Sequence, residues 1–175
     1  NSVYSISTAI EHGQLNRVEP ALQRAERNIT RCDNIITELL DYTRTHELKL
    51  QPLCLDEWLQ RILAEQTIPE DITLSVDLVK GVEILLDPER FRRVVVNLVD
   101  NACQAMQETS RPDRPEQILR IQSEIVDSQL KISITDTGPG IPPEVMPHIF
   151  EPLYSTKSFG VGLGLPIVKS IMEQH

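Results

Sequence analysis

The stretch Gly160-Val161-Gly162-Leu163-Gly164-Leu165-Pro166 says more about the fold than any other part of the sequence. Its glycines alternate with apolar residues up to a predicted helix that begins near Leu163, and proline is tolerated in the first turn of a helix. The N–H groups at a helix start have no partner within the helix, so they form an anion site without needing Lys or Arg. The spacing matches neither a P-loop nor a G-x-G-x-x-G dinucleotide turn.

Glycine and proline are concentrated around this stretch. Five of the seven glycines lie within residues 138–164, and six of the twelve prolines lie in the same region or just after it. The whole chain has 175 residues, of which 40% are hydrophobic, and a net charge of −9. These values suit one domain, or a small domain plus an appendage, with a real core. They exclude nucleic acid as a partner, because the chain has no basic field to attract it.

The remaining composition disfavours a membrane-spanning or secreted chain and a metal site built from cysteine or histidine. No apolar run approaches the roughly 20 residues that span a bilayer, and no signal-peptide pattern opens the chain. The cysteines, Cys32, Cys54 and Cys103, have neither zinc spacing nor a disulfide pattern, and the four histidines are scattered. We expect reduced, mostly buried thiols in a cytoplasmic chain without membrane contact. Whether the parent protein is anchored in a membrane stays open.

Residues 19–45 are predicted to form one long helix. Apolar residues recur at alternating steps of three and four, the heptad pattern of a coiled-coil seam: Leu22, Ala25, Ile29, Cys32, Ile36 and Leu39. Residues 1–12 are predicted to end an antiparallel partner helix, with residues 13–17 as the turn. A lone seam cannot bury itself, so we expect a homodimer through residues 1–50. The alternative is a simple amphipathic helix on a globular core.

Beyond residue 50 the pattern changes to short strands mixed with helices. It predicts a helix at 56–64 capped by Asp56, strands at 72–76 and 82–86, a helix at 88–107, a loop at 111–115, and a hairpin of strands 118–126 and 130–135 around Asp127-Ser128. The 88–107 helix presents one apolar face, formed by Phe91, Val95, Leu98, Ala102 and Ala105. This order predicts an α+β fold, an α/β sandwich with helices on one face of a sheet.

Two asparagines interrupt the apolar pattern of the 88–107 helix. Asn97 and Asn101 are four residues apart, so they lie on one face, with Asp100 beside them. Amide oxygens in line suit a hard cation, and the NH2 groups suit phosphate. The alternative is a pair of surface amides, but Asn97 breaks an otherwise aliphatic run, which favours a site.

A second polar cluster, Asp136-Thr137-Gly138-Pro139-Gly140, follows the 130–135 strand. Asp136 can accept a hydrogen bond from an exocyclic amine, and Gly138 and Gly140 let the backbone approach a ligand. A plain tight turn is the alternative. Residues 150–157, which come next, have the composition of a mobile lid from which Lys157 can reach a phosphate.

The order of these motifs resembles that of the ATP-binding boxes of sensor histidine kinases. The family's N, G1, F and G2 boxes correspond to Asn97-Leu98-Val99-Asp100-Asn101-Ala102, Asp136-Thr137-Gly138-Pro139-Gly140, Phe150-Glu151-Pro152 and Gly160-Val161-Gly162-Leu163-Gly164-Leu165. Residues 38–44 are similar to the end of the second helix of the family's phosphotransfer bundle. The sequence of residues 155–157, in a short lid, most resembles that of the nitrogen-regulation-type subgroup of these kinases. The resemblance implies a Bergerat-type ATP-binding catalytic domain at 51–175, preceded at 1–50 by part of a helical-hairpin dimerisation and histidine-phosphotransfer segment.

The resemblance also implies ATP and Mg²⁺ as cofactors and a role for each matching residue. Asn101 would coordinate Mg²⁺ between the phosphates, with Asn97 assisting in catalysis. Asp136 would accept a hydrogen bond from the adenine amino group, and Gly138 and Gly140 would shape the adenine pocket and the lid hinge. The remaining phosphate contacts would come from the Lys157 side chain and from the backbone of Gly162, Leu163 and Gly164.

Asn97 separates subclasses of the wider superfamily. Gyrase-like, chaperone-like and mismatch-repair-like relatives carry Glu at this position, where it activates a hydrolytic water. Asn cannot act as a base at pH 7, so the motif favours transfer of the phosphoryl group to a protein nucleophile over hydrolysis.

No histidine of the chain matches the family's phosphoacceptor motif, H-E-(I/L)-(R/N)-(N/T)-P. The residues after His12 do not fit it, and the proline that follows His46 comes one place late. We therefore expect the acceptor, and the general base beside it, to precede residue 1. We also expect the family's last two strands to follow His175, so that this chain is a fragment.

The expected function is that of the ATP-binding catalytic part of a sensor histidine kinase. It would transfer the ATP γ-phosphate to a histidine outside this chain, from which an aspartate of a response-regulator receiver domain takes it. The alternatives are a dimerisation and nucleotide-binding module that is inactive alone, and a Bergerat-type ATPase. Residues 51–175 carry a net charge of −8 and residues 1–50 only −1, so bulk charge does not attract the nucleotide.

Overall fold

The structure, a computed structural model, describes residues 18–26, 28–29, 32, 36, 39, 47–107, 116–157 and 160–175. The chain divides into two units, Asn1–Thr45 and His46–His175. In the first unit every described residue is helical, in agreement with the predicted long helix. Several predictions fall outside the described residues. They concern the partner helix and turn at 1–17, the motif at 38–44 except Leu39, the loop at 111–115, and the two histidines His12 and His46.

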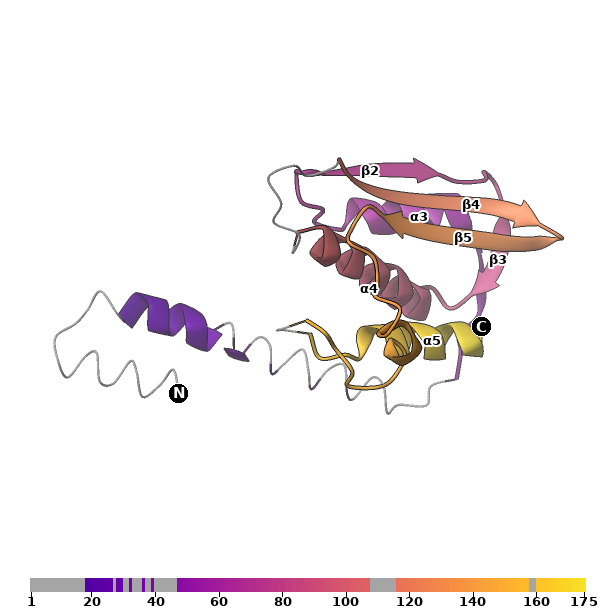
Figure 1. The fold of residues 1–175 in the computed structure, drawn as a ribbon. Helices are drawn as coiled ribbons and strands as arrows, with labels where there is room; N and C mark the ends of the chain where they lie inside the picture. Colours follow the sequence, from indigo (N-terminus) through magenta and orange to yellow (C-terminus); the bar gives the residue numbers. More distant parts are fainter. Residues whose placement is uncertain are drawn as a thin grey trace. The chain divides into compact units, whose positions relative to one another are not determined.

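The second unit alternates short strands with helices (Figure 1). In chain order its elements are β1 (Gln51–Cys54), α3 (Leu55–Ala64), β2 (Ile72–Asp77), β3 (Glu83–Leu86), α4 (Pro88–Gln107), β4 (Gln117–Val126), β5 (Gln129–Asp136), a 3₁₀ helix (Met146–His148) and α5 (Gly164–Gln174). No helix of the described ranges is long and apolar enough to cross a membrane.

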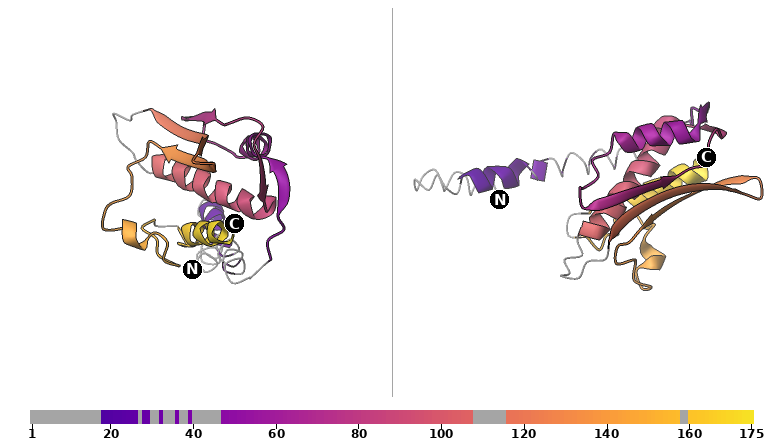
Figure 2. Two further views of the ribbon diagram at one scale, coloured as in Figure 1. Left: turned by 90° about the vertical axis from the view of Figure 1, so that its right-hand side faces the viewer. Right: turned by 90° about the horizontal axis from the view of Figure 1, so that it is seen from above.

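The strands form two separate ladders. In the three-stranded sheet, β4 lies in the centre, parallel to β2 and antiparallel to β5. The other ladder pairs β1 with β3 in antiparallel fashion. α4 lies between the three-stranded sheet and α5, with α3 beside α4 (Figures 1 and 2). The predicted α/β sandwich, with its helices on one face of a sheet, is thus confirmed.

The β4–β5 hairpin places Asp136, the last residue of β5, on the face of the sheet that the helices cover. Its two turn residues, Asp127 and Ser128, both have positive φ, of 50° and 64°, as the twist of a two-residue hairpin requires. Leu119 pairs with Asp136, and paired residues of an antiparallel ladder point to the same face. Since Leu119 is fully buried against the helices, Asp136 lies on that face too.

The core forms where α3 and α4 pack against the sheet. Trp58 of α3 and Phe91 of α4 are buried with their ring centroids 5.7 Å apart. The buried residues of α4 are Phe91, Val94, Val95, Val99, Ala102, Cys103 and Met106. The predicted apolar face was therefore too narrow, because the sheet and α5 cover α4 from two sides.

Two local predictions for the start of the second unit are wrong. The sequence analysis predicts no strand before residue 56, whereas Gln51–Cys54 form β1 with Pro52 inside it. Asp56 does not cap α3: the helix begins at Leu55, and Asp56 Oδ1 instead accepts hydrogen bonds from the backbone N–H of Gly81 (3.1 Å) and from Cys54 Sγ (3.0 Å). The thiols are also less buried than expected, since Cys103 is buried, Cys54 is half-buried and Cys32 is exposed.

Candidate nucleotide-binding site

The two asparagines of α4 face the start of α5. Asn97 Nδ2 donates to the carbonyl of Arg93 (2.9 Å), one turn earlier on α4. A Cβ atom added at Gly164 would lie 2.8 Å from Asn97 Oδ1 and 3.8 Å from Asn101 Nδ2. Glycine at 164 therefore lets α5 begin directly against both amides, and the carbonyl oxygen of Asn97 points to that junction.

The N–H groups in the first turn of α5 lie at the same junction. The N-cap residue is Leu163, and none of the described side chains forms a hydrogen bond at this cap. Ile167 N donates to the carbonyl of Leu163 (3.0 Å), and Pro166 has no N–H. The free helix end carries partial positive charge, so this turn can bind an anion next to Asn97.

Gly162 joins the lid segment to the loop before α5. It has φ of +76°, and a Cβ atom there would overlap the backbone of Tyr154. Leu153 N donates to the carbonyl of Gly162 (3.0 Å). Only glycine satisfies both the backbone conformation and this close approach. Figure 1 shows the orange segment after β5 running past α4 to the start of α5.

Lys157 reaches α4 from the lid. Its Nζ donates to Oδ1 of Asn101 (3.0 Å) and to Oε1 of Gln104 (2.8 Å). Gln104 was not among the predicted site residues, although its spacing of three from Asn101 places it on the same helix face. Partial burial raises the pKa of the Asp100 carboxyl, and the nearby charge of Lys157 opposes that rise.

Asp136 and Gly138 lie near the other end of α4. Asp136 Oδ1 accepts from the backbone N–H of Gly138 (2.8 Å), and a Cβ atom at Gly138 would lie 3.3 Å from Cβ of Ala105. Gly140 has φ of +74°, and no described atom lies within 4 Å of an added Cβ there. α4 thus carries Asn97 and Asn101 along its middle and packs against the Asp136 cluster in its last turns.

Two more polar residues contribute at this cluster: Thr137, which belongs to it but was given no role from the sequence, and Gln117, which the sequence analysis missed. Thr137 Oγ1 accepts from Ile118 N (2.9 Å) and donates to the carbonyl of Glu116 (2.9 Å). Gln117 is buried, its Nε2 donates to the carbonyl of Met106 (3.2 Å), and its Oε1 has no hydrogen-bond partner within the described part of the chain.

The place of Gln117 in the sheet suits a ligand at Asp136. It lies two residues before Leu119, the partner of Asp136, and so on the same face of the sheet. An unsatisfied buried acceptor costs about 1–3 kcal/mol. A polar group bound beside Gln117 on this face would offset that cost. The sequence does contain a signal for Gln117: by alternation it falls on the buried face of a strand whose other buried positions are mostly apolar.

Both the sequence and the structure match known proteins. Residues 86–175 match the family described as histidine kinase-, DNA gyrase B-, and HSP90-like ATPase. The sensor histidine kinase ZraS of Klebsiella oxytoca is 32% identical over 153 residues, which cover 85% of this chain and 32% of ZraS. The mycobacterial sensor histidine kinase MprB is 28% identical with a TM-score of 0.60, over 72% of this chain and 80% of that chain. The histidine kinase ThkA, in complex with the response regulator protein TrrA, has a TM-score of 0.70 at 23% identity, over 99% of this chain and 51% of that chain.

The chain therefore belongs to the histidine kinase-, DNA gyrase B- and HSP90-like ATPases. Within that family, the proteins reported above as similar to this chain are sensor histidine kinases, the ATP-binding transferases of two-component signalling. This confirms the resemblance found in the sequence. The chain spans about a third of the length of the curated relatives that it matches.

Proposed function

We propose that residues 51–175 are the ATP-binding catalytic domain of a sensor histidine kinase, and that residues 1–50 belong to its dimerisation and phosphotransfer segment. One observation carries the proposal. The ammonium of Lys157 lies 3.0 Å from Asn101 Oδ1, and Gly164 brings the start of α5 against Asn97. A cation, two amides and a helix N-terminus thus meet at one place, as a polyphosphate requires.

The chemistry of these residues fits ATP with Mg²⁺. Bound there, ATP supplies the transferable phosphoryl group and Mg²⁺ offsets its charge. Asn97 offers a hard amide oxygen of the kind that binds Mg²⁺ in proteins, and Asn101 Oδ1 would offer a second one on exchanging its hydrogen bond from Lys157 for the cation. At the other end of α4, Asp136 would accept a hydrogen bond from the adenine amino group, and Gly138, where a Cβ atom would crowd Asp136 and Ala105, keeps the backbone close to α4.

The phosphate end depends on donors that carry little net charge. The N–H groups of Gly162, Leu163 and Gly164 lie in or just before the first turn of α5, where the helix dipole favours an anion. Lys157 adds one full positive charge, held close to α4 by Asn101 and Gln104. The anion would thus be held by local donors, although residues 51–175 carry a net charge of −8.

Transfer to histidine is favoured over hydrolysis by the residue at position 97. Asn97 has no basic atom at pH 7, and its Nδ2 is bound to the carbonyl of Arg93. It therefore cannot activate water as a carboxylate would. The acceptor histidine and the general base lie outside the described residues. Since ThkA forms a complex with a response regulator, we propose that a receiver domain also takes the phosphoryl group in this system.

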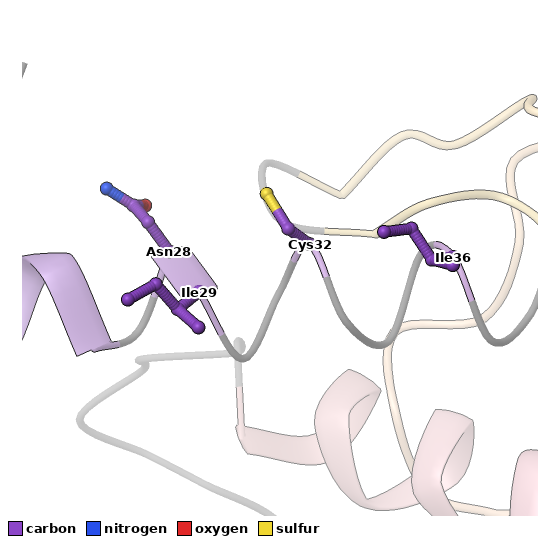
Figure 3. A pocket seen from close by; sticks show the side chains of 4 residues that line it. All are labelled: Asn28, Ile29, Cys32 and Ile36. Carbon is purple, nitrogen blue, oxygen red and sulfur yellow. The ribbon is translucent and has the colours of Figure 1, made fainter.

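Residues 1–50 supply the surface for a homodimer. Along the helical segment, Ile29 and Ile36 are 69% and 56% exposed in the single chain. Asn28, Ile29, Cys32 and Ile36 line an open hollow there (Figure 3), and none of the proposed ATP-binding residues contributes to it. Exposed aliphatic side chains at heptad spacing are typical of a helix that pairs with another.

The decisive experiment supplies the acceptor separately. The chain is incubated with γ-labelled ATP, Mg²⁺ and a helical-hairpin protein that carries the acceptor histidine. Label that appears on the acceptor in an acid-labile form supports the proposal. ATP binding without transfer would instead support a module that is inactive alone, and release of phosphate without an acceptor would support an ATPase.

A further inference from the structure

One buried carboxylate joins three distant segments of the second unit. Asp87 is 6% exposed and lies between β3 and α4. Its Oδ2 accepts a hydrogen bond from the backbone N–H of Lys49 (2.9 Å), and its Oδ1 accepts one from that of Arg90 (3.1 Å). Its own N–H donates to Nε2 of His175 (3.0 Å). Asp87 thus contacts residues that precede β1, begin α4 and follow α5.

The bond to Lys49 extends the β1–β3 ladder by means of a side chain. Gln51 pairs with Leu86, so the same register places Lys49 opposite Pro88, which has no N–H for another rung. Pro88 therefore cannot donate to the carbonyl of Lys49, and the N–H of Lys49 donates to the carboxylate of Asp87 in place of a backbone carbonyl. Residues 47–50, which lead from the helical segment into β1 and are called here the linker, are therefore fastened to the start of α4.

On the side of α4, Asp87 decides where the helix begins. Its side chain caps the N–H of Arg90, its carbonyl accepts from Phe91 N (2.8 Å), and Pro88 occupies the first helical position. An aspartate in this place stabilises a helix both as a cap and through the helix dipole.

On the side of α5, Asp87 holds the end of the helix through His175. Because Nε2 accepts from Asp87, the ring proton lies on Nδ1, which donates to the carbonyl of Ile171 (2.8 Å). The ring also packs edge-on against Phe91, with centroids 6.0 Å apart. The start of α4 is therefore held to the end of α5 by Asp87–His175 and by a hydrogen bond from Arg90 to Gln174, while Asn97 meets Gly164 at the start of α5.

We propose that Asp87 is a positioning residue that couples the linker to the nucleotide site through α4 and α5. The inference rests on the proposed function, because the nucleotide must bind at the Asn97–Gly164 junction. A displacement of the linker at Lys49 moves the first turn of α4. A helix carries that movement along its axis to Asn97, ten residues further on. By linkage, nucleotide binding changes the stability of the Lys49–Asp87 hydrogen bond by the same factor.

The amide proton of Lys49 reports on this bond directly. We expect Mg²⁺ and saturating ATP to change its hydrogen exchange rate, measured by NMR on the full chain, by about fivefold or more, the low end of typical couplings. If the amides of Gly164 and Leu165 become protected while exchange at Lys49 stays the same, the coupling is refuted and the nucleotide site stands. If ATP does not bind at all, the proposed function fails and this inference fails with it.

Two variants remove the bond from opposite sides. Lys49→Pro deletes the N–H donor and leaves Asp87 intact. Asp87→Asn keeps a capping oxygen, as Asn and Asp are equally good caps, but its single carbonyl cannot serve both Lys49 and Arg90. We expect each to shift the Kd for ATP by about fivefold or more, the double variant to shift it no further, and Lys49→Ala, which keeps the N–H, to leave it unchanged.

The variants also allow a clear refutation. Wild-type ATP affinity in Lys49→Pro, at a wild-type melting temperature, overturns the coupling. If Lys49→Pro and Asp87→Asn fail to fold, the exchange rate of Lys49 in the unaltered chain decides the question by itself.

Discussion

At the scale of single residues, Gly162 and Gly140 share a backbone conformation but not an environment. Both have φ near +75°, yet an added Cβ overlaps the backbone of Tyr154 at Gly162 and meets no described atom at Gly140. We expect Gly140→Ala to cost about 1 kcal/mol of stability, from the left-handed conformation alone. Gly162→Ala should cost about 2–4 kcal/mol and weaken ATP binding, because the backbone must shift as well.

Urea unfolding and ATP titration of the two alanine variants test this difference. Equal losses of stability would show that the close approach of Gly162 to Tyr154 does not matter to the fold.

Asn101 is the residue on which the proposed Mg²⁺ site depends. Replacing it by alanine removes the proposed Mg²⁺ ligand and one of the two acceptors that hold Lys157. We expect Asn101→Ala to lower the affinity for ATP in Mg²⁺ by about tenfold or more, which corresponds to about 1.4 kcal/mol. Calorimetric titration measures it, with Arg92→Ala on the same helix, which removes only an exposed ion pair with Glu65, as the control. Unchanged affinity in Asn101→Ala would remove the site assignment.

Asp87 makes stability depend on pH in the acid range. Burial alone would raise its pKa, but backbone N–H groups of Lys49, Arg90 and Glu89 outweigh burial, and the pKa lies below its ordinary value. A lowered pKa contributes stability in full above the unfolded value of about 3.9, and that contribution is lost as the pH falls through the folded value. We expect stability to fall more steeply below about pH 4 in the wild type than in Asp87→Asn.

Urea midpoints of the wild type and Asp87→Asn, measured from neutral to acid pH, test this dependence. Parallel curves would mean that Asp87 is no more stabilised as a carboxylate in the folded chain than in the unfolded one.

Single residues of the candidate site could be picked out from the sequence where their spacing marks them. Asn97 and Asn101 stand out because two amides four residues apart interrupt an aliphatic run. Gln104 and Gln117 do not stand out, since a glutamine has ordinary uses on any surface. Their roles depend on Lys157 and on the register of β4 with β5, which only the tertiary fold supplies.

At the scale of elements, the turn of the β4–β5 hairpin is the clearest target for stabilisation. Ser128 has φ of 64°, a conformation that costs most L-residues about 1–2 kcal/mol. We expect Ser128→Gly to stabilise the chain by about 1 kcal/mol. Ser133→Gly, in the middle of β5, should destabilise it, because glycine in an extended strand loses more backbone entropy. Denaturant midpoints measure both, and a loss of stability in Ser128→Gly would contradict the turn geometry.

The elements that were predicted well are those whose ends are marked locally. α4 runs from Pro88 to Gln107 as expected, since Asp87-Pro88 is a strong start signal. β1 could not be predicted in the same way. It is four residues long and contains Pro52, and it exists because β3 pairs with it. A short strand that contains proline has no local pattern, and its partner lies beyond α3 and β2 in the chain.

At the scale of the whole molecule, the exposed seam predicts self-association. Leu22, Ile29 and Ile36 are at least 43% exposed, so pairing would remove considerable apolar surface from water. We expect the chain to be a dimer in size-exclusion chromatography with light scattering, and Ile36→Asp to shift it toward monomer. Glu26→Ala, an exposed polar position on the same segment, is the control. A wild-type chain that is monomeric at high concentration would contradict the pairing.

The single tryptophan makes the centre of the second unit optically visible. Trp58 is buried against Phe91, and Phe91 in turn contacts the ring of His175, so all intrinsic indole fluorescence arises where α3, α4 and α5 meet. Emission from this one site needs no attached dye and contains no signal from the helical segment. Any loosening of the first turn of α4 would expose the indole to water and shift its emission, so the chain carries its own sensor of the place where Asp87 is anchored.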